Sequence, residues 1–214
     1  MLKKVLIAVL AFAVMISFAA DEKGQVIQLP KPQITGGKPL MEALNSRKSM
    51  REFSSEQLSL QTLSNLLWAA FGINRPESGK RTAPSASNWQ EIDIYVATQN
   101  AVYVYDAKAN LLKVVVEGDL RADFGRQPFV KTAPVVLAFV ADYSKMGRAS
   151  QADKDFYSAV DTGFISQNVY LFCASANLNT VVIGIVDRAT LAQKLQLKQE
   201  QKIILTQPVG YPKK

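Results

Sequence analysis

The chain has 214 residues, of which 48% are hydrophobic and 20% are charged, and its formal net charge is +7. This length and composition are typical of one globular domain with a sizeable core, and they exclude a disordered or fibrous protein. The cations are scattered among acidic residues, without the aromatic-interleaved basic stripe of a nucleic-acid-binding surface. We therefore expect no nucleic-acid partner.

Two features of the composition narrow the possible chemistry. The sequence contains no histidine, which excludes histidine-based zinc sites and Ser-His-Asp or Cys-His catalysis. The single cysteine, Cys173, cannot form an intrachain disulfide, and its apolar helical surroundings predict a buried small hydrophobic residue. Any chemistry must come from carboxylates, hydroxyls, lysine, arginine, the backbone or a bound organic cofactor.

Residues 1–19 have the pattern of a secretory signal peptide. Lys3 and Lys4 precede an apolar run that ends at Phe18, and small residues surround the expected cleavage point at Ala19. The run is shorter than the roughly 20 residues of a spanning helix, so we expect cleavage rather than a retained anchor. The mature protein would be periplasmic or secreted, with no stable membrane anchor, and its net charge would be two lower, at +5.

The rest of the chain is interpreted as an arm followed by one domain. Residues 20–38, which include Pro30, Pro32, Gly36 and Gly37, predict an extended N-terminal arm, and residues 39–214 form the domain. Hydrophobic periodicity predicts helices at 40–45, 60–71, 151–178 and 188–195, and strands at 92–97, 102–105, 111–116, 134–140, 180–185 and 201–210. The first three strands form a meander, and residues 134–140, apolar on both faces, are the central strand. This mixture of helices and antiparallel strands indicates the α+β class.

The second predicted helix has clear end signals. Ser59 is positioned to cap its N-terminus and Gly72 to end it. Trp68 on this helix is interpreted as a packing residue, with contact to a ligand as the alternative. Between residues 119 and 131 a polar connection is expected to contain one helical turn.

A basic stretch lies between the first two helices, from Ser46 to Phe53. Its cations and hydroxyls can neutralise and hydrogen-bond a phosphate, because arginine offers a planar fork and lysine a mobile charge. A solvated basic helix end is the alternative interpretation. For Arg51, an ion pair with Glu52 or Glu56 is a further alternative to a phosphate or substrate contact.

A second stretch, Pro84-Ser85-Ala86-Ser87-Asn88, is a turn of small and amide residues just ahead of a strand. Such a turn allows a flat ring to approach backbone and side-chain donors. An ordinary surface loop is the alternative.

These stretches resemble the FMN-dependent nitroreductase superfamily. The resemblance is carried by Arg47-Lys48-Ser49-x-Arg51-x-Phe53, Leu66 to Pro76, Arg81 to Ala86, Asp161-x-Gly163-x-x-x-Gln167-Asn168 and Val209 to Pro212. It extends over essentially the whole mature chain. The order and spacing of these motifs are similar to the branch of SagB-type thiazoline/oxazoline dehydrogenases.

The resemblance implies a nitroreductase-like fold, with a mostly antiparallel central sheet flanked by helices, and a homodimer that packs through the long helix. It also implies an FMN site at the subunit boundary. The residues it implicates are Arg47, Lys48, Ser49, Arg51, Pro84, Ser85, Ala86, Ser87, Asn88, Gln127, Ile183 and Gly184. Lys213 or Lys214 would supply a further phosphate contact, unless the tail is disordered. Asp161 and Gln167 would be buried at the subunit contact or lie on a solvated helix face.

The resulting expectation is an exported FMN-dependent oxidoreductase that uses a ping-pong mechanism with a small-molecule electron donor and acceptor. Nicotinamide cofactors are not expected outside the cytoplasm, so we expect a donor other than free NAD(P)H. One alternative is a non-catalytic flavin-binding protein of the cell envelope. Another is a structural domain without a cofactor.

Overall fold

The computed structural model describes residues 26–213, so the predicted signal peptide and Lys214 lie outside the described residues. Its centre is a seven-stranded sheet in the order β1-β6-β5-β4-β7-β9-β8, in which all neighbouring strands are antiparallel. The strands are β1 (Val26–Gln28), β4 (Ile92–Ala97), β5 (Ala101–Asp106), β6 (Leu111–Glu117), β7 (Val135–Asp142), β8 (Asn179–Thr180) and β9 (Gln201–Gly210). A separate hairpin pairs β2 (Ile73–Arg75) with β3 (Lys80–Arg81).

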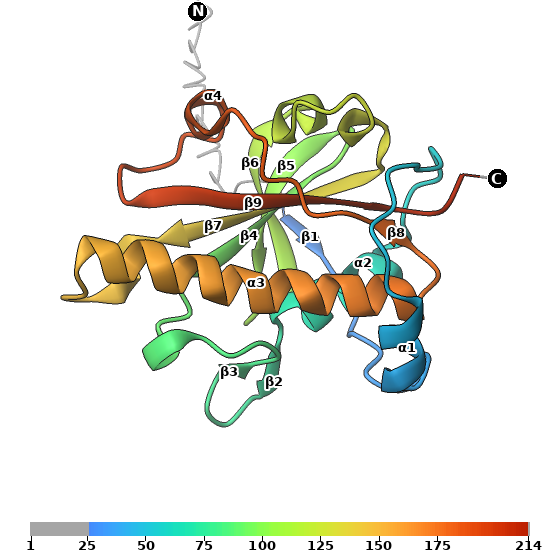
Figure 1. Ribbon diagram of the computed structural model, residues 1–214, viewed down its shortest axis with the longest axis horizontal. Coiled ribbons are helices and arrows are strands. Elements are labelled where there is room, and N and C mark those ends of the chain that lie inside the picture. The colour runs from blue at the N-terminus through green and yellow to red at the C-terminus, as the bar shows by residue number, and fades with distance from the viewer. Residues whose placement is uncertain (1–25, 214) are drawn as a thin grey trace, which may run out of the picture.

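Within residues 26–213, four α-helices and four short 3₁₀ turns accompany the strands (Figure 1). The helices are α1 (Leu40–Ser46), α2 (Leu60–Phe71), α3 (Gln151–Ser175) and α4 (Arg188–Lys194). The turns are η1 (Ala86–Asn88), η2 (Arg121–Phe124), η3 (Val130–Thr132) and η4 (Tyr143–Met146). This confirms the predicted α+β class, and none of the helices in residues 26–213 is long and apolar enough to cross a membrane.

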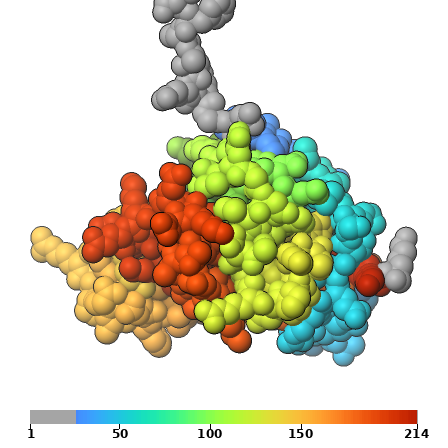
Figure 2. Space-filling view, turned by 90° about the horizontal axis from the view of Figure 1, so that it is seen from above, coloured from blue at the N-terminus to red at the C-terminus, as the bar shows by residue number. Residues whose placement is uncertain are grey.

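The sheet separates two apolar layers. On one face, β4 presents Ile92, Ile94 and Val96 to a core built with α2 and α3. On the other face, Tyr95 and Ala97 pack with residues of η2, η3 and α4. Side chains alternate between faces along a strand, so β4 contributes to both cores. Figure 1 shows α3 lying across the first face, and Figure 2 shows the segments of α4 and η2–η3 side by side over the other.

The predicted meander is confirmed as β4-β5-β6, and β7 is buried along nearly its whole length at the centre of the sheet. The predicted strand at 180–185 is mostly wrong. Only Asn179–Thr180 forms strand β8, followed by an isolated bridge between Ile183 and Thr206. The backbone N–H of Val182 donates to the hydroxyl of Tyr170 (2.9 Å) instead of to a neighbouring strand, and this interrupts the ladder.

The described part of the arm belongs to the body of the protein. Strand β1 pairs with β6 at the edge of the sheet, and Leu29 is buried in the core with 3% of its surface exposed. The backbone N–H of Leu29 donates to the carbonyl of Asn110 (3.1 Å).

Helix α2 has the predicted ends, because the Ser59 side chain accepts a hydrogen bond from the N–H of Thr62 (3.0 Å) and Gly72 follows the last helical residue. The indole N–H of Trp68 donates to the carbonyl of Ile73 (3.2 Å), which fits a packing role. Cys173 is 1% exposed, as predicted, and burial raises the pKa of its thiol, so it is an inert core residue.

Candidate functional site

The basic stretch is an extended segment that leaves α1 at Arg47 and runs beside β8. The N–H of Met50 donates to the carbonyl of Thr180 (2.9 Å), and the side-chain amide of Asn179 donates to the carbonyl of Glu52 (2.7 Å). Consecutive side chains of an extended segment point to opposite sides. The stretch therefore has two chemically different sides.

One side of this segment faces Tyr170 on α3. The guanidinium of Arg47 lies 5.2 Å from the centre of the Tyr170 ring, and the hydroxyls of Ser49 and Tyr170 are hydrogen-bonded at 2.9 Å. Arg51 shares this side by alternation and is exposed. Within residues 26–213 it forms no ion pair with Glu52 or Glu56, so its charge is available to a ligand.

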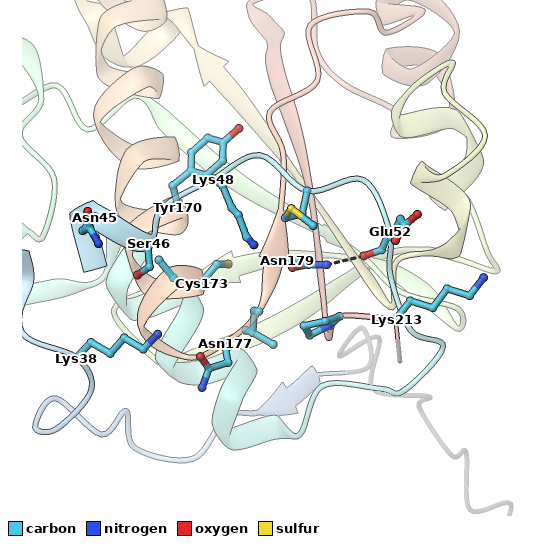
Figure 3. Close-up of a pocket in the computed structure, with 14 residues that line it drawn as sticks. Lys38, Asn45, Ser46, Lys48, Glu52, Tyr170, Cys173, Asn177, Asn179 and Lys213 are labelled. Carbon is cyan, nitrogen blue, oxygen red and sulfur yellow. Dashed lines mark hydrogen bonds between the residues drawn. The ribbon is translucent and has the colours of Figure 1, made fainter. Parts of the chain in front are cut away.

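The other side lines a cavity of about 540 Å³ near the C-terminal end of α3. Lys48, Met50 and Glu52 contribute to its wall, together with Lys38 and Lys213. Figure 3 shows the Lys48 side chain pointing into this cavity, whereas the hydroxyl of Tyr170 points away from it. The predicted phosphate clamp is therefore divided, with Arg47 and Ser49 on one side of the segment and Lys48 on the other.

Tyr170 connects the basic stretch to the segment that precedes α4. Its hydroxyl binds Ser49 and also accepts the N–H of Val182 (2.9 Å). Two positions further on, Gly184 lies on the surface, where an added Cβ would meet only Leu205 Cδ2 at 3.9 Å. Ile183 points into the core with 3% exposure, so its side chain is unavailable to a ligand and only its backbone could contribute.

Gln127 lies next to this same segment. The N–H of Arg126 donates to the carbonyl of Ile185 (3.3 Å), and a Cβ built on Gly125 would be 3.1 Å from Ile183 Cγ2 and 3.2 Å from Gln127 Oε1. That oxygen is buried and has no hydrogen-bond partner among the described residues. The segments 47–51, 125–127 and 182–184, which carry the predicted residues Arg47 to Arg51, Gln127, Ile183 and Gly184, thus meet in one region.

The turn at 84–88 has an unusual backbone conformation. Ser87, Asn88 and Gln90 all have positive φ, at 49°, 54° and 49°, a conformation that non-glycine residues adopt only when their surroundings hold them there. The Ser85 hydroxyl accepts the N–H of Gln90 (2.8 Å), and the N–H of Ala86 donates to Asp161 on α3 (2.8 Å). Pro84, Ser85 and Asn88 line a small cavity of about 220 Å³ with Arg75 and Arg81.

This turn lies far from the other three segments within one chain. It is held at Asp161 and they are held at Tyr170, nine positions further along α3. Nine positions correspond to about 13 Å along the helix axis and two and a half turns, so the two side chains project from opposite sides. Figure 1 shows the short green helix that contains η1 below the N-terminal half of α3, and the 47–53 segment rising from α1 at the C-terminal end of α3. The cavities that include Lys48 and Pro84 share no lining residue.

Comparison with known proteins identifies the family to which this chain belongs. Residues 44–211 match the model of the nitroreductase family. The chain belongs to the nitroreductase family. It is 30% identical over 198 residues to "Putative nitroreductase MJ1384" of Methanocaldococcus jannaschii, a match that covers 87% of this chain and 98% of that protein.

Two solved structures relate this chain to the nitroreductase fold. A protein of Ralstonia eutropha JMP134, described as "a putative nitroreductase", is 41% identical, with a TM-score of 0.86 and coverage of 90% of this chain and 92% of that one. The NADPH:FMN oxidoreductase of Vibrio harveyi, in complex with NAD⁺, is 22% identical, with a TM-score of 0.61 and coverage of 82% and 69%. The second likeness concerns the fold alone.

The charged and hydrogen-bonding groups of this nitroreductase-family chain fit a flavin nucleotide. Arg47 and Arg51 provide positive charge for a phosphate, and Ser49 provides a hydroxyl beside them. The unpartnered Oε1 of Gln127 is a hydrogen-bond acceptor next to Ile183 and the open surface at Gly184. No cluster of residues suited to a metal ion occurs in the part of the chain that the structure describes.

Sequence reasoning missed two residues of this candidate site and its surroundings. Tyr170 stood in what appeared only as an apolar helical run, although a tyrosine buried in such a run usually needs a hydrogen-bond partner. Glu91, fully buried beside the 84–88 turn, was not singled out from the sequence. Asp161 was predicted to lie at a subunit contact or on a solvated face, and it is 2% exposed within the chain, where it accepts the N–H of Ala86.

Proposed function

We propose that this protein is an FMN-dependent oxidoreductase whose flavin lies against the region where residues 47–51, 125–127 and 182–184 meet. The observation that carries the proposal is the hydroxyl of Tyr170, which joins Ser49 to Val182 and so brings a cationic segment next to an open glycine surface. The Vibrio harveyi relative, an NADPH:FMN oxidoreductase by name, supports the choice of cofactor.

A homodimer would complete this site. The outer face of α3 exposes Phe156, Val160 and Phe164, with 62%, 36% and 46% of their surfaces accessible. These residues recur at a spacing of four and form one exposed apolar stripe along the helix. Packing of two such stripes about a two-fold axis would bring the 84–88 turn of one protomer towards the three segments of the other.

The residues of the chain would bind and orient the flavin. Arg47 and Arg51 would neutralise the phosphate, and Ser49, fixed by Tyr170, would donate to it or to the ribityl chain. The backbone of Ile183 and Gly184 would let the ring lie close, and the partner's turn would exclude water from it. The bound flavin would supply hydride or electron transfer in a ping-pong cycle, in which a small-molecule donor leaves before an acceptor enters. This scheme needs no side-chain acid or base, which agrees with a chain that has no histidine.

We further propose that the protein belongs to the SagB-type branch and is exported. The branch rests on the order and spacing of its motifs, from Arg47-Lys48-Ser49 to Val209-Gly210-Tyr211-Pro212. Export rests on the charged, apolar and small-residue pattern of residues 1–19. An exported enzyme would take electrons from a donor other than free NAD(P)H.

The visible spectrum of the purified mature protein tests the cofactor. We expect a yellow protein that retains or takes up FMN, and we expect Arg47→Ala to weaken FMN binding by about tenfold or more, the effect of removing one charge-assisted contact. Lys48→Ala is the matched control, since Lys48 points to the other side of the segment. A colourless protein that refuses added FMN would refute the proposal.

Stopped-flow kinetics test the activity. Reduction of the bound flavin by a small-molecule donor, followed by reoxidation with a quinone or nitroaromatic compound, is the expected result. A flavin that is bound but never reduced would instead indicate the non-catalytic flavin-binding protein. Efficient steady-state turnover with NADPH at low micromolar KM would contradict the proposed donor class.

A further inference from the structure

Two carboxyl groups are buried together beneath the 84–88 turn. Glu91, just before β4, has no exposed surface, and Asp161 on α3 is 2% exposed. The Ser85 hydroxyl donates to Glu91 Oε2 (3.2 Å), and Asp161 Oδ2 accepts the N–H of Ala86 (2.8 Å). The two carboxyl groups therefore hold adjacent residues of the same turn.

The charges around this pair do not neutralise it. Within residues 26–213 neither Glu91 nor Asp161 forms an ion pair with lysine or arginine. Tyr143 on η4 faces Glu91, and its hydroxyl donates to Asp155 on α3 (2.6 Å). Two ionised carboxylates in such surroundings would repel each other, with no cation to offset the repulsion.

One buried oxygen of the pair has no hydrogen-bond partner within residues 26–213, which indicates that this oxygen carries a proton. Glu91 Oε1 is buried and has no hydrogen-bond partner among the described groups, which is unfavourable for a carboxylate oxygen. If Oε1 carries a proton, it becomes a donor, and the carboxylate of Asp161 is the acceptor beside it. Burial, and then the charge of Asp161, raises the pKa of Glu91 to about 7.

The turn that depends on this pair is conformationally demanding. Ser87, Asn88 and Gln90 are held at positive φ, so the turn keeps its shape only while its anchors persist. Two anchors, at Ser85 and Ala86, end on the pair, and a third runs from the Arg81 guanidinium to Gln90 Oε1 (2.8 Å).

We propose that Glu91 and Asp161 share one proton and that this proton positions the 84–88 turn for contact with the flavin of the partner protomer. With the proton present, Glu91 donates to Asp161, and Asp161 holds Ala86. With the proton lost, the two carboxylates separate and release Ser85 and Ala86 from their places. Glu91 and Asp161 are then positioning residues rather than catalytic ones, and the inference rests on the proposed function for its consequence at the flavin.

The direct test measures FMN affinity on both sides of the transition, at roughly pH 6 and roughly pH 8.5. We expect the wild-type dissociation constant to rise by about fivefold or more over this range, the effect of losing a hydrogen-bonded anchor. Glu91→Gln keeps a donor towards Asp161 but cannot ionise, and we expect its affinity to change less than twofold. An identical pH dependence in wild type and Glu91→Gln would overturn the proposal.

Asp93→Asn is the matched control. Asp93 lies on β4 two positions from Glu91, but its carboxylate is paired with Lys145 (2.7 Å) and contacts no residue of the turn. This variant should keep the wild-type pH dependence of FMN affinity. If Asp93→Asn removes that dependence as completely as Glu91→Gln does, the assignment to the Glu91–Asp161 pair is wrong.

A second measurement does not require flavin. Trp89 follows the turn and packs edge-on against Tyr157 at 5.8 Å between ring centres. In a Trp68→Phe background, its fluorescence reports the turn alone, and we expect a transition near neutral pH that Glu91→Gln abolishes. Absence of this transition overturns the shared proton. Its presence in a protein that binds no FMN at either pH would support the shared proton while refuting the proposed function.

Discussion

At the scale of single residues, the site depends on one hydroxyl. Tyr170 binds Ser49 and accepts the N–H of Val182, so it fixes two segments that are far apart in the sequence. Tyr170→Phe would keep the ring beneath Arg47 but leave the Val182 amide without its partner. We expect a loss of about 1 to 2 kcal/mol in stability and a several-fold weaker FMN affinity.

Chemical denaturation and flavin titration measure these two effects. Tyr157→Phe is the control, because Tyr157 also lies on α3 and its hydroxyl has no hydrogen-bond partner within the described residues. Equal effects of the two substitutions on FMN affinity would show that Tyr170 has no special role in the site.

The raised pKa of Glu91 also predicts that the stability of the fold depends on pH. Its pKa is raised from 4.5 to about 7, first by burial and then by Asp161. The folded state therefore holds a proton over a pH range in which the unfolded state has released it. This contribution is complete below about pH 4.5 and is lost as the pH rises through about 7, an effect of roughly 2 to 3 kcal/mol.

Glu91→Gln removes this dependence. Thermal unfolding at pH 5 and pH 8 should show wild type losing more stability than the variant as the pH rises. A variant whose unfolding free energy falls with pH as steeply as that of wild type would place the titration elsewhere.

At the scale of elements, two glycines distinguish packing from ligand contact. A Cβ on Gly210, at the end of β9, would lie 2.5 Å from Pro134 Cδ, so Gly210→Ala should destabilise the fold by about 1 to 3 kcal/mol. At Gly184 the space is open, and Gly184→Ala should change stability by less than about 0.5 kcal/mol. If the flavin lies along this segment, the same methyl group should weaken FMN binding about tenfold.

Unfolding curves and FMN titrations of both variants measure these changes in stability and in FMN affinity. An unchanged FMN affinity in Gly184→Ala would remove residues 183–184 from the proposed site.

Most elements could be predicted from local pattern. Alternation along Ile92–Ala97 and the cap at Ser59 each depend on residues close in sequence, and the structure has them as expected. The end of the 180–185 strand could not be predicted, because it depends on the hydroxyl of Tyr170. The burial of Glu91 likewise depends on Asp161, 70 positions away in the chain.

The candidate site was predictable as a set of segments but not as an arrangement. Motifs located residues 47–51 and 84–88, yet their relative position depends on the helical phase of α3 between Asp161 and Tyr170. That phase places them on opposite sides of the helix. The alternation that turns Lys48 away from Arg47 was readable from the sequence only once the segment was known to be extended.

At the scale of the whole molecule, the proposed site is complete only if two chains associate. The stripe on α3 is the surface we expect to mediate this, and Phe164 lies at its C-terminal end, 46% exposed. Phe164→Glu would place a charge where the two helices meet, so we expect the protein to become monomeric. Because each flavin would then lose the partner's 84–88 turn, FMN affinity should fall by about tenfold or more.

Light scattering coupled to size exclusion, together with flavin titration, measures both outcomes on the same samples. Met41→Glu is the control, because Met41 is exposed to 75% on α1, away from the stripe, and its substitution should leave mass and FMN affinity unchanged. A Phe164→Glu monomer that binds FMN as tightly as wild type would mean that one chain forms the whole site. The 84–88 turn would then have another role, since α3 separates it from Arg47 and Ser49 within the chain.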